Sequence, residues 1–242
     1  MSLRHTAQGL LATTELTLPV MAYGLLGSLD QGDVDARVQR WATRLVEQAQ
    51  IDLEVRGREN GGDGSEPLIV MSNHQSLFDV PLLFLAVRGR MRMVAKAELF
   101  RIPFFGRGMQ AAGVMKVDRG NREQSIETLK AQGHSLLSSG TRVWLAPEGT
   151  RSKTGALGPF KSGGFYMALD NGVRILPVAI QGTRDVLPAG AVRVNPGKRV
   201  VITVLPPVDP KEYGHARRKE LIAEVHRRIA EALGQDPAAT PA

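Results

Sequence analysis

The stretch that decides the fold is LIVMSNHQSLFD, residues 68–79. Its apolar start, Leu68-Ile69-Val70-Met71, predicts a buried strand that ends near Ser72. A turn at Asn73-His74 follows, and a helix is expected over Phe78 to Val87, because Pro81 is tolerated in a first helical turn. The order strand, turn, helix places a histidine directly after a strand.

His74 and Asp79 bring an imidazole and a carboxylate to this turn. A neutral imidazole can take a proton from an alcohol near pH 7, since its unperturbed pKa is about 6.5. If Asp79 accepts a hydrogen bond from Nδ1, the tautomer is fixed with Nε2 free to act. The alternative is structural, with His74 capping the helix and Asp79 in its first turn. Within one continuous helix the two side chains would point about 140° apart, so they meet only if His74 precedes the helix.

The composition fits one α/β domain with a small appendage, since the chain has 242 residues, of which 43% are hydrophobic. It has no cysteine, which excludes disulfides, thiolate metal sites and cysteine nucleophiles. A net charge of +7 favours an anionic partner, such as a membrane surface, a phosphate-bearing substrate, an acidic carrier or nucleic acid. Nucleic acid is disfavoured by an aromatic content of 5% and the lack of a dense basic block.

Familiar hydrolase motifs are missing from the sequence. It contains no G-x4-G-K-[ST] loop, no His-Glu-x-x-His pair and no Gly-x-Ser-x-Gly elbow, which disfavours nucleotide hydrolysis, zinc hydrolysis and the serine-hydrolase route. We therefore expect neither a bound metal nor a resident cofactor.

The first 56 residues predict a helical hairpin, and residues 57–242 a catalytic domain. The domain opens with a glycine-rich loop, residues 57–67, which separates its strands and helices from the hairpin. The uncharged stretch Leu16 to Leu29 has 14 residues, fewer than the roughly 20 that span a membrane, so it suits an interfacial, re-entrant or core segment. Asp33 is expected to cap a second helix. Its apolar face would either pack on the catalytic domain or lie among lipid headgroups; it comprises Val34, Val38, Trp41, Leu45 and Ala49.

Strand-like and helix-like segments alternate after the loop, which predicts an α/β fold with a mostly parallel central sheet flanked by helices. The expected strands are Leu68–Met71, Met91–Ala95, Val114–Val117, Arg142–Leu145, Ile175–Ile180 and Val200–Leu205. The expected helices are Phe78–Val87, Glu98–Met109, Arg122–Leu137, Gly163–Asp170 and Lys211–Leu233. The tail, residues 234–242, is expected to be disordered.

Four ordered stretches resemble the motifs of the glycerophospholipid acyltransferase family, whose best-known members acylate lysophosphatidate. The first is Asn73-His74-x4-Asp79, and the second runs from Lys96 to Gly106 and continues to Val117-Asp118-Arg119. The third is Pro147-Glu148-Gly149-Thr150-Arg151-Ser152, and the fourth is Ile175-Leu176-Pro177-Val178-Ala179. Together they cover residues 73 to 180.

The resemblance implies a 1-acyl-sn-glycerol-3-phosphate acyltransferase. His74 would be the general base for the acceptor hydroxyl and Asp79 its partner, and no acyl-enzyme is needed because a thioester donor is already activated. Lys96, or a backbone N–H near the helix start, would face the developing oxyanion. The donor would be acyl-CoA or an acyl-carrier-protein thioester.

Further residues of these motifs are candidates for substrate binding. Arg119 and Arg151 would hold the acceptor phosphate, because guanidinium groups bind phosphate oxygens bidentately. Glu148 and Thr150, around Gly149, would position the glycerol hydroxyls. A surface ion pair is the alternative for the basic residues. The apolar second motif would line an acyl-chain tunnel or belong to the core, with Phe100, Phe104, Phe105 and Met109 as candidates.

Many relatives carry an N-terminal transmembrane helix, whereas this sequence has only the short uncharged stretch. We therefore expect peripheral or monotopic binding to an anionic membrane surface, on the cytoplasmic face of the cell membrane. Two other functions stay open: an acyltransferase for another acceptor, such as glycerol 3-phosphate or another lyso-lipid, and a non-catalytic lipid-binding protein.

Overall fold

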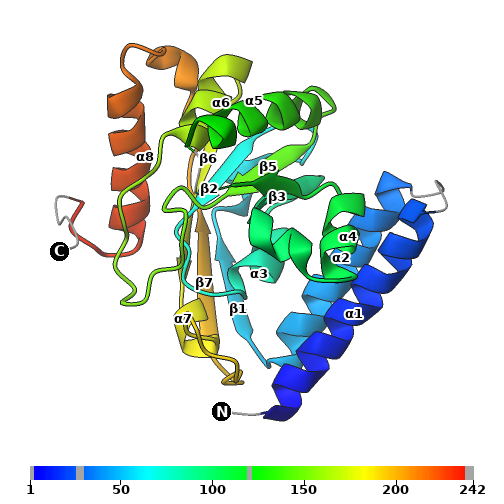
Figure 1. Cartoon of the computed structure of the whole chain (residues 1–242). Coiled ribbons are helices and arrows are strands. Elements are labelled where there is room, and N and C mark those ends of the chain that lie inside the picture. Colours follow the sequence, from blue (N-terminus) through cyan, green and yellow to red (C-terminus); the bar gives the residue numbers. More distant parts are fainter. Residues whose placement is uncertain (1–2, 26–29, 119–121, 238–242) are drawn as a thin grey trace.

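The fold is a central sheet with helices on both faces (Figure 1). A computed structural model describes residues 3–25, 30–118 and 122–237. Seven strands form the sheet in the order β1-β7-β6-β2-β5-β3-β4. They are β1 (Asp52–Arg56), β2 (Ile69–Ser72), β3 (Met91–Lys96), β4 (Met115–Val117), β5 (Arg142–Leu145), β6 (Ile175–Gln181) and β7 (Arg199–Val204).

Parallel pairing dominates the sheet: β6 and β7 pair antiparallel, and the other neighbouring strands pair parallel. The predicted α/β class with a mostly parallel sheet is therefore confirmed. The α-helices are α1 (Leu3–Leu25), α2 (Gln31–Gln48), α3 (Asp79–Ala86), α4 (Phe105–Ala111), α5 (Arg122–Ser138), α6 (Gly163–Asn171), α7 (Thr183–Val186) and α8 (Arg218–Ala232). The 3-10 helices are η1 (Arg58–Gly61), η2 (Ala97–Arg101) and η3 (Pro210–Glu212).

Each face of the sheet has its own apolar core, because successive strand residues point to opposite faces. Val70 of β2 belongs to the core that includes residues of α2 and α3. Its neighbours Ile69 and Met71 belong to the other core, with residues of α5, α6 and α8. β2 is therefore packed on both faces in the middle of the sheet, and the turn after Ser72 follows a well-packed strand.

The N-terminal helices pack on the rest of the molecule. α1 contacts α2 and α4, and α2 contacts α3. The predicted apolar face of α2 is turned inward. An ion pair of 2.9 Å between Asp35 of α2 and Arg90, the residue before β3, also holds the helix in place. α2 begins at Gln31 with Asp30 as its N-cap residue, so the predicted cap Asp33 is wrong: it lies in the first turn. Residues 26–29 of the uncharged stretch lie outside the described residues.

No helix within the described residues has the length and apolar character that a membrane crossing requires.

Three predicted boundaries were wrong. Residues 52–56, assigned to the hairpin, form β1 and pair with β7 in the sheet. The predicted helix Glu98–Met109 is split into η2 and α4, because Pro103 interrupts it. The segment Lys211–Leu233 is likewise divided, with η3 before α8.

The tail is partly ordered, contrary to the prediction of disorder. The Gln235 side chain donates to the Gly155 carbonyl at 2.9 Å and accepts from the Leu157 N–H at 2.8 Å. Residues 238–242 lie outside the described part of the chain.

Candidate active site

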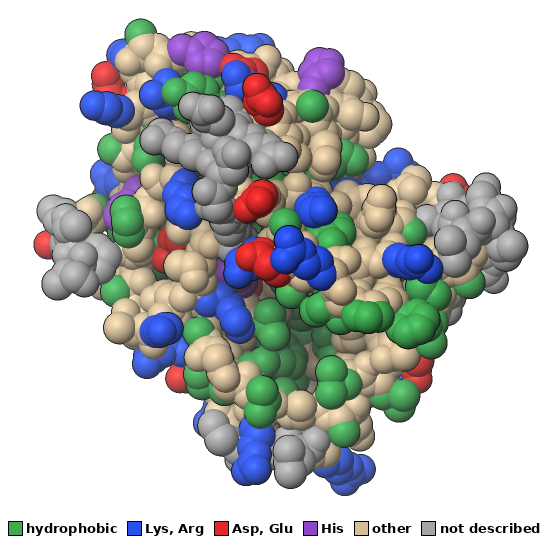
Figure 2. Space-filling view, viewed as in Figure 1, with side chains coloured by type: hydrophobic (Ala, Val, Ile, Leu, Met, Phe, Trp, Pro, Cys, Tyr) green, Lys and Arg blue, Asp and Glu red, His purple; other side chains and the backbone are tan. Residues whose placement is uncertain are grey.

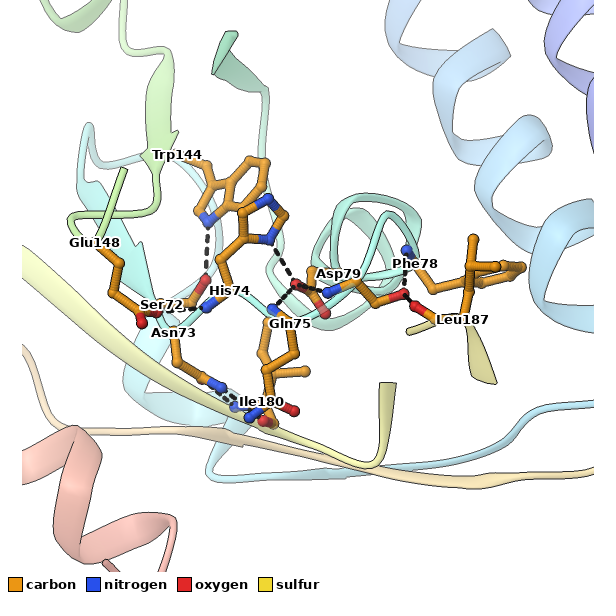
Figure 3. Close-up of polar contacts among 11 residues, drawn as sticks. Ser72, Asn73, His74, Gln75, Phe78, Asp79, Trp144, Glu148, Ile180 and Leu187 are labelled. Atoms are coloured by element: carbon orange, nitrogen blue, oxygen red, sulfur yellow. Dashed lines mark hydrogen bonds and ion pairs between the residues drawn. The ribbon is translucent and has the colours of Figure 1, made fainter. Parts of the chain in front are cut away.

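His74 and Asp79 meet at the carboxyl end of β2 (Figure 3). Nδ1 of His74 lies 2.6 Å from Oδ2 of Asp79. The Asp79 side chain is fully buried, whereas 15% of the His74 side chain is exposed. Since α3 begins at Asp79, the histidine lies before the helix, and the predicted contact is confirmed.

Asp79 orients the imidazole through one oxygen. Oδ2 also accepts the backbone N–H groups of Gln75 at 2.7 Å and Ser76 at 2.9 Å. An oxygen that accepts from several N–H groups acts as an acceptor toward the ring too, so Nδ1 is the donor and the neutral ring carries its lone pair on Nε2. Asp79 thus does both things that the sequence left open: it lies in the first helical turn and it holds the histidine.

Glu148 fixes the backbone on both sides of the site. It follows β5, is buried, and accepts the His74 N–H on Oε1 at 2.8 Å and the Gly158 N–H on Oε2 at 2.9 Å. Burial raises the pKa of the Glu148 carboxyl, and these two hydrogen bonds oppose that rise. Glu148 therefore connects the turn at His74 to the loop at Gly158 through hydrogen bonds. Its expected contact with the glycerol hydroxyls stays a prediction.

The loop after Glu148 closes over the turn that carries the histidine. The N–H of Ser152 donates to the His74 carbonyl at 2.7 Å, and the Gln75 side chain donates to the Gly155 carbonyl at 3.2 Å. Gln235 holds Gly155 from the other side. Neither Ser152 nor Gln235 was among the predicted site residues, because backbone hydrogen bonds between distant segments leave no sequence signal.

Two further residues position the site from neighbouring strands. The Asn73 side chain donates to the Ile180 carbonyl at 2.9 Å and accepts the Ile180 N–H at 2.8 Å, which ties the turn to β6. The Trp144 ring stands edge-on to the His74 ring, with centroids 5.9 Å apart, and its Nε1–H donates to Ser72 Oγ at 3.0 Å. Trp144 falls within a predicted strand, where an apolar residue indicates core, so its contact with the histidine was not predicted.

The predicted phosphate-binding segment follows Glu148. Gly149 has a φ of +74°, and a Cβ there would lie 2.9 Å from the Lys161 Nζ, so glycine suits this turn. Thr150 is exposed and Arg151 is half-buried. Within the described residues, the Arg151 guanidinium has neither a hydrogen bond nor an ion pair. The surface ion pair that was the alternative for Arg151 is therefore not what the structure shows.

The other predicted cations stand differently. Lys96, at the end of β3, forms an ion pair of 3.1 Å with Glu98, so its ammonium group is already engaged. The backbone N–H groups of Gln75 and Ser76 are engaged by Asp79 and are not spare oxyanion donors. Arg119 lies outside the described residues.

The four candidates for an acyl-chain pocket differ in their burial. Met109 is buried, Phe100 and Phe105 are half-buried, and Phe104 is 62% exposed. An open hollow of about 500 Å³ beside β4 is lined by Phe100 but by none of the other three. With 62% of its surface exposed, Phe104 does not lie in an enclosed cavity, and its contact with an acyl chain stays a prediction.

No group of three histidine or carboxylate side chains that could hold a metal ion is present in the described parts of the chain.

The chain is similar to several known proteins. A family model described as Acyltransferase matches residues 52–181. The 1-acyl-sn-glycerol-3-phosphate acyltransferase of Salmonella typhimurium is 35% identical over 67% of this chain and 67% of its own length. A chloroplastic 1-acyl-sn-glycerol-3-phosphate acyltransferase of Brassica napus is 32% identical over 74% of this chain, and the match spans about half of that longer protein (50%).

A solved structure shares the architecture over the whole chain. The crystal structure of the 1-acyl-sn-glycerophosphate (LPA) acyltransferase PlsC from Thermotoga maritima superposes with a TM-score of 0.79 at 27% identity. The superposition covers 99% of this chain and 98% of the Thermotoga chain. With a family model matched over more than half of its length, this chain belongs to the acyltransferase family.

Proposed function

We propose that this protein is a 1-acyl-sn-glycerol-3-phosphate O-acyltransferase, which transfers a fatty acyl group from a thioester to the free hydroxyl of 1-acyl-sn-glycerol 3-phosphate and forms phosphatidic acid. One observation carries the chemistry: the 2.6 Å contact of His74 Nδ1 with a buried carboxylate, which leaves Nε2 as the proton acceptor. The names of the bacterial and chloroplast relatives support the choice of acceptor.

In the proposed reaction, Nε2 of His74 removes the proton as the acceptor oxygen attacks the thioester carbonyl carbon. Asp79 stabilises the resulting imidazolium. The tetrahedral intermediate then collapses, the carbon–sulfur bond breaks, and the thiolate takes the proton from the imidazolium. Because the thioester supplies a good leaving group, the enzyme needs no nucleophile of its own, in keeping with a sequence without cysteine.

We assign the acceptor phosphate to Arg151. Its guanidinium lies on the loop that donates a hydrogen bond to the His74 carbonyl, and no described residue neutralises it. A cation without a partner beside the general base suits a dianionic headgroup. Arg119, from the second motif, is the proposed second phosphate ligand, and Lys96 the proposed oxyanion donor once the substrate displaces Glu98.

We propose that the protein works at the cytoplasmic face of the cell membrane, bound peripherally through α1 and α2. Leu10, Leu11 and Leu18 of α1 are exposed, with 66%, 56% and 43% of their surface accessible, and the net charge of +7 favours anionic lipid. Sedimentation with phosphatidylglycerol vesicles at low and high salt tests this. Failure to sediment at low salt would exclude it.

The test of the reaction is acyl transfer to lysophosphatidate by the His74→Ala variant. We expect transfer to fall by at least about 10³-fold with the fold retained, since general-base catalysis accounts for that order of rate. His134→Ala, at an exposed histidine of α5, is the matched control. Substantial activity of His74→Ala would refute the assigned base. A panel of acceptors, each with acyl-CoA and acyl-carrier protein, identifies the substrates.

A further inference from the structure

The connection between η2 and α4 holds a bulky residue in an unusual conformation. Phe104 has φ +62° and ψ −50°, a region that L residues with large side chains rarely adopt. Tight hydrogen bonds fix this turn: the Gly106 N–H donates to the Ile102 carbonyl at 2.9 Å and the Gly108 N–H to the Phe104 carbonyl at 2.9 Å. Backbone strain that is held this firmly is typical of functional positions.

The strained turn presents apolar side chains to solvent. Leu99, Ile102 and Phe104, here called the apolar ridge, are 38%, 47% and 62% exposed. Three exposed apolar side chains thus lie within six residues of sequence, and a group of exposed apolar residues marks an interaction site more often than isolated ones do. The ridge is rigid, so presenting it costs little ordering when a partner binds.

Charge and position identify the partner of the apolar ridge. Arg101, between Leu99 and Ile102, and Arg107, three residues after Phe104, are both exposed. The ridge leads into α4, which packs against α1, the helix with its own exposed leucines. Figure 2 shows hydrophobic side chains gathered over this part of the molecule, next to an apolar hollow, with Lys and Arg around them. Apolar groups bordered by basic ones fit the surface of an anionic bilayer.

We propose that the apolar ridge inserts into an anionic membrane surface as a second anchor, separate from the N-terminal helices, and sets the orientation of the active site toward the lipid. This inference rests on the proposed function, since it assumes that the acceptor is taken from a membrane. It also accounts for the exposure of the Phe104 side chain, 62% of whose surface is accessible.

A single-cysteine probe tests the insertion directly, because the natural chain has no cysteine. Phe104→Cys is labelled with an environment-sensitive nitrobenzoxadiazole dye and mixed with phosphatidylcholine vesicles with or without phosphatidylglycerol. The matched control is Ala223→Cys, at an exposed position of α8 on the opposite side of the molecule (Figure 1). We expect the emission at position 104 to shift to the blue and strengthen with anionic vesicles, and the emission at position 223 to stay unchanged.

Other results would overturn the proposal. An unchanged signal at position 104, while the protein sediments with the same vesicles, would leave the N-terminal helices as the anchor. A shift of the emission produced by monomeric lysophosphatidate without vesicles would indicate that position 104 contacts the acyl chain of the substrate and not the membrane. A shift that depends on protein concentration alone would indicate contact with a second copy of the chain.

An activity measurement separates this inference from the proposed reaction. Ile102→Ser is expected to weaken binding to anionic vesicles about tenfold, because one buried aliphatic side chain contributes that order of affinity. It should keep wild-type transfer to acceptor dispersed in detergent. Equal loss of transfer in both assays would contradict a role in membrane binding, whereas inactivity of the wild-type protein in both would instead refute the proposed reaction.

Discussion

Asp79 holds His74 and two backbone N–H groups with the same oxygen, so its charge and its geometry can be separated by substitution. In Asp79→Asn the amide oxygen can keep the backbone contacts, but the amide can no longer stabilise an imidazolium. We expect kcat to fall by about 10²–10⁴-fold with little change in KM. Steady-state kinetics with lysophosphatidate measures this, and Asp185→Asn, at an exposed carboxylate, is the control. Wild-type kcat in Asp79→Asn would remove Asp79 from catalysis.

Arg151 is our proposed ligand of the acceptor phosphate. Arg151→Ala should raise the KM for lysophosphatidate by about 10–100-fold, the usual range for a lost charge-assisted hydrogen bond to phosphate. The thioester KM should change less than twofold. Lys153→Ala, at an exposed lysine two residues on, is the control for general charge effects. An unchanged acceptor KM in Arg151→Ala would exclude it from the phosphate site.

The contact between His74 and Asp79 could be predicted from sequence, because the two residues are five positions apart and the turn between strand and helix can bring them together. Glu148 could not be interpreted as fully. Its hydrogen-bond partners are the backbone N–H groups of His74 and Gly158, and any residue type supplies such groups. Trp144 shows the same limit, since an indole in a buried strand has no sequence feature that points to a particular neighbour.

Among the elements, the segment that follows α8 reaches the loop that covers the site. Gln235 bonds Gly155 and Leu157 with the two ends of its amide, while the loop in turn bonds the turn at His74. Gln235→Ala removes both contacts, each worth about 1 kcal/mol. We expect the loop to open more often, the acceptor KM to rise about 3–10-fold, and kcat to stay within twofold.

Trypsin measures that opening independently of activity. Lys153 is exposed in the loop, so cleavage after it should be faster in Gln235→Ala than in the wild type under native conditions. Removal of residues 238–242, which keeps Gln235, is the matched control. Equal cleavage rates for the three proteins would show that Gln235 does not position the loop.

The elements that the sequence predicted well are buried ones. β2 and β5 are buried at every residue, and their predicted limits differ from the observed ones by at most one residue. β1 is an edge strand with charged residues at both ends, Asp52 and Arg56, so its hydrophobic pattern is weak. The break between η2 and α4 at Pro103 is accompanied by a close approach that the helical pattern does not reveal: a Cβ on Gly106 would lie 2.1 Å from the Phe100 carbonyl oxygen.

At the scale of the whole molecule, the site is assembled where three layers meet. β2, β5 and β6 deliver the turn at His74, Glu148 and Ile180 to one edge of the sheet. α3 supplies the Asp79 carboxylate from one face of the sheet. On the other face, Gln235, which follows α8, forms hydrogen bonds with the covering loop. Global stability and the order of the site are therefore coupled through α8.

His226 makes this coupling dependent on pH. It lies on α8, and its ring packs edge-on against Phe160 with centroids 4.8 Å apart. Burial lowers the pKa of His226 below its ordinary value of 6.5, although a hydrogen bond to the Gly158 backbone opposes the shift. A histidine whose pKa is lower in the folded state contributes stability above the unfolded pKa, and that contribution is lost as the pH falls through the folded pKa.

His226→Phe keeps an aromatic contact with Phe160 but cannot titrate. We expect the free energy of unfolding of the wild type, relative to His226→Phe, to be constant above about pH 7 and to decrease below about pH 6.5. Urea unfolding between pH 5 and 8 measures the difference, and His134→Phe, at an exposed histidine, serves as the reference for a histidine replaced by phenylalanine. A difference that stays flat down to pH 5 would mean that α8 accommodates a charged His226 without strain, and the coupling between α8 and the covering loop would then rest on Gln235 alone.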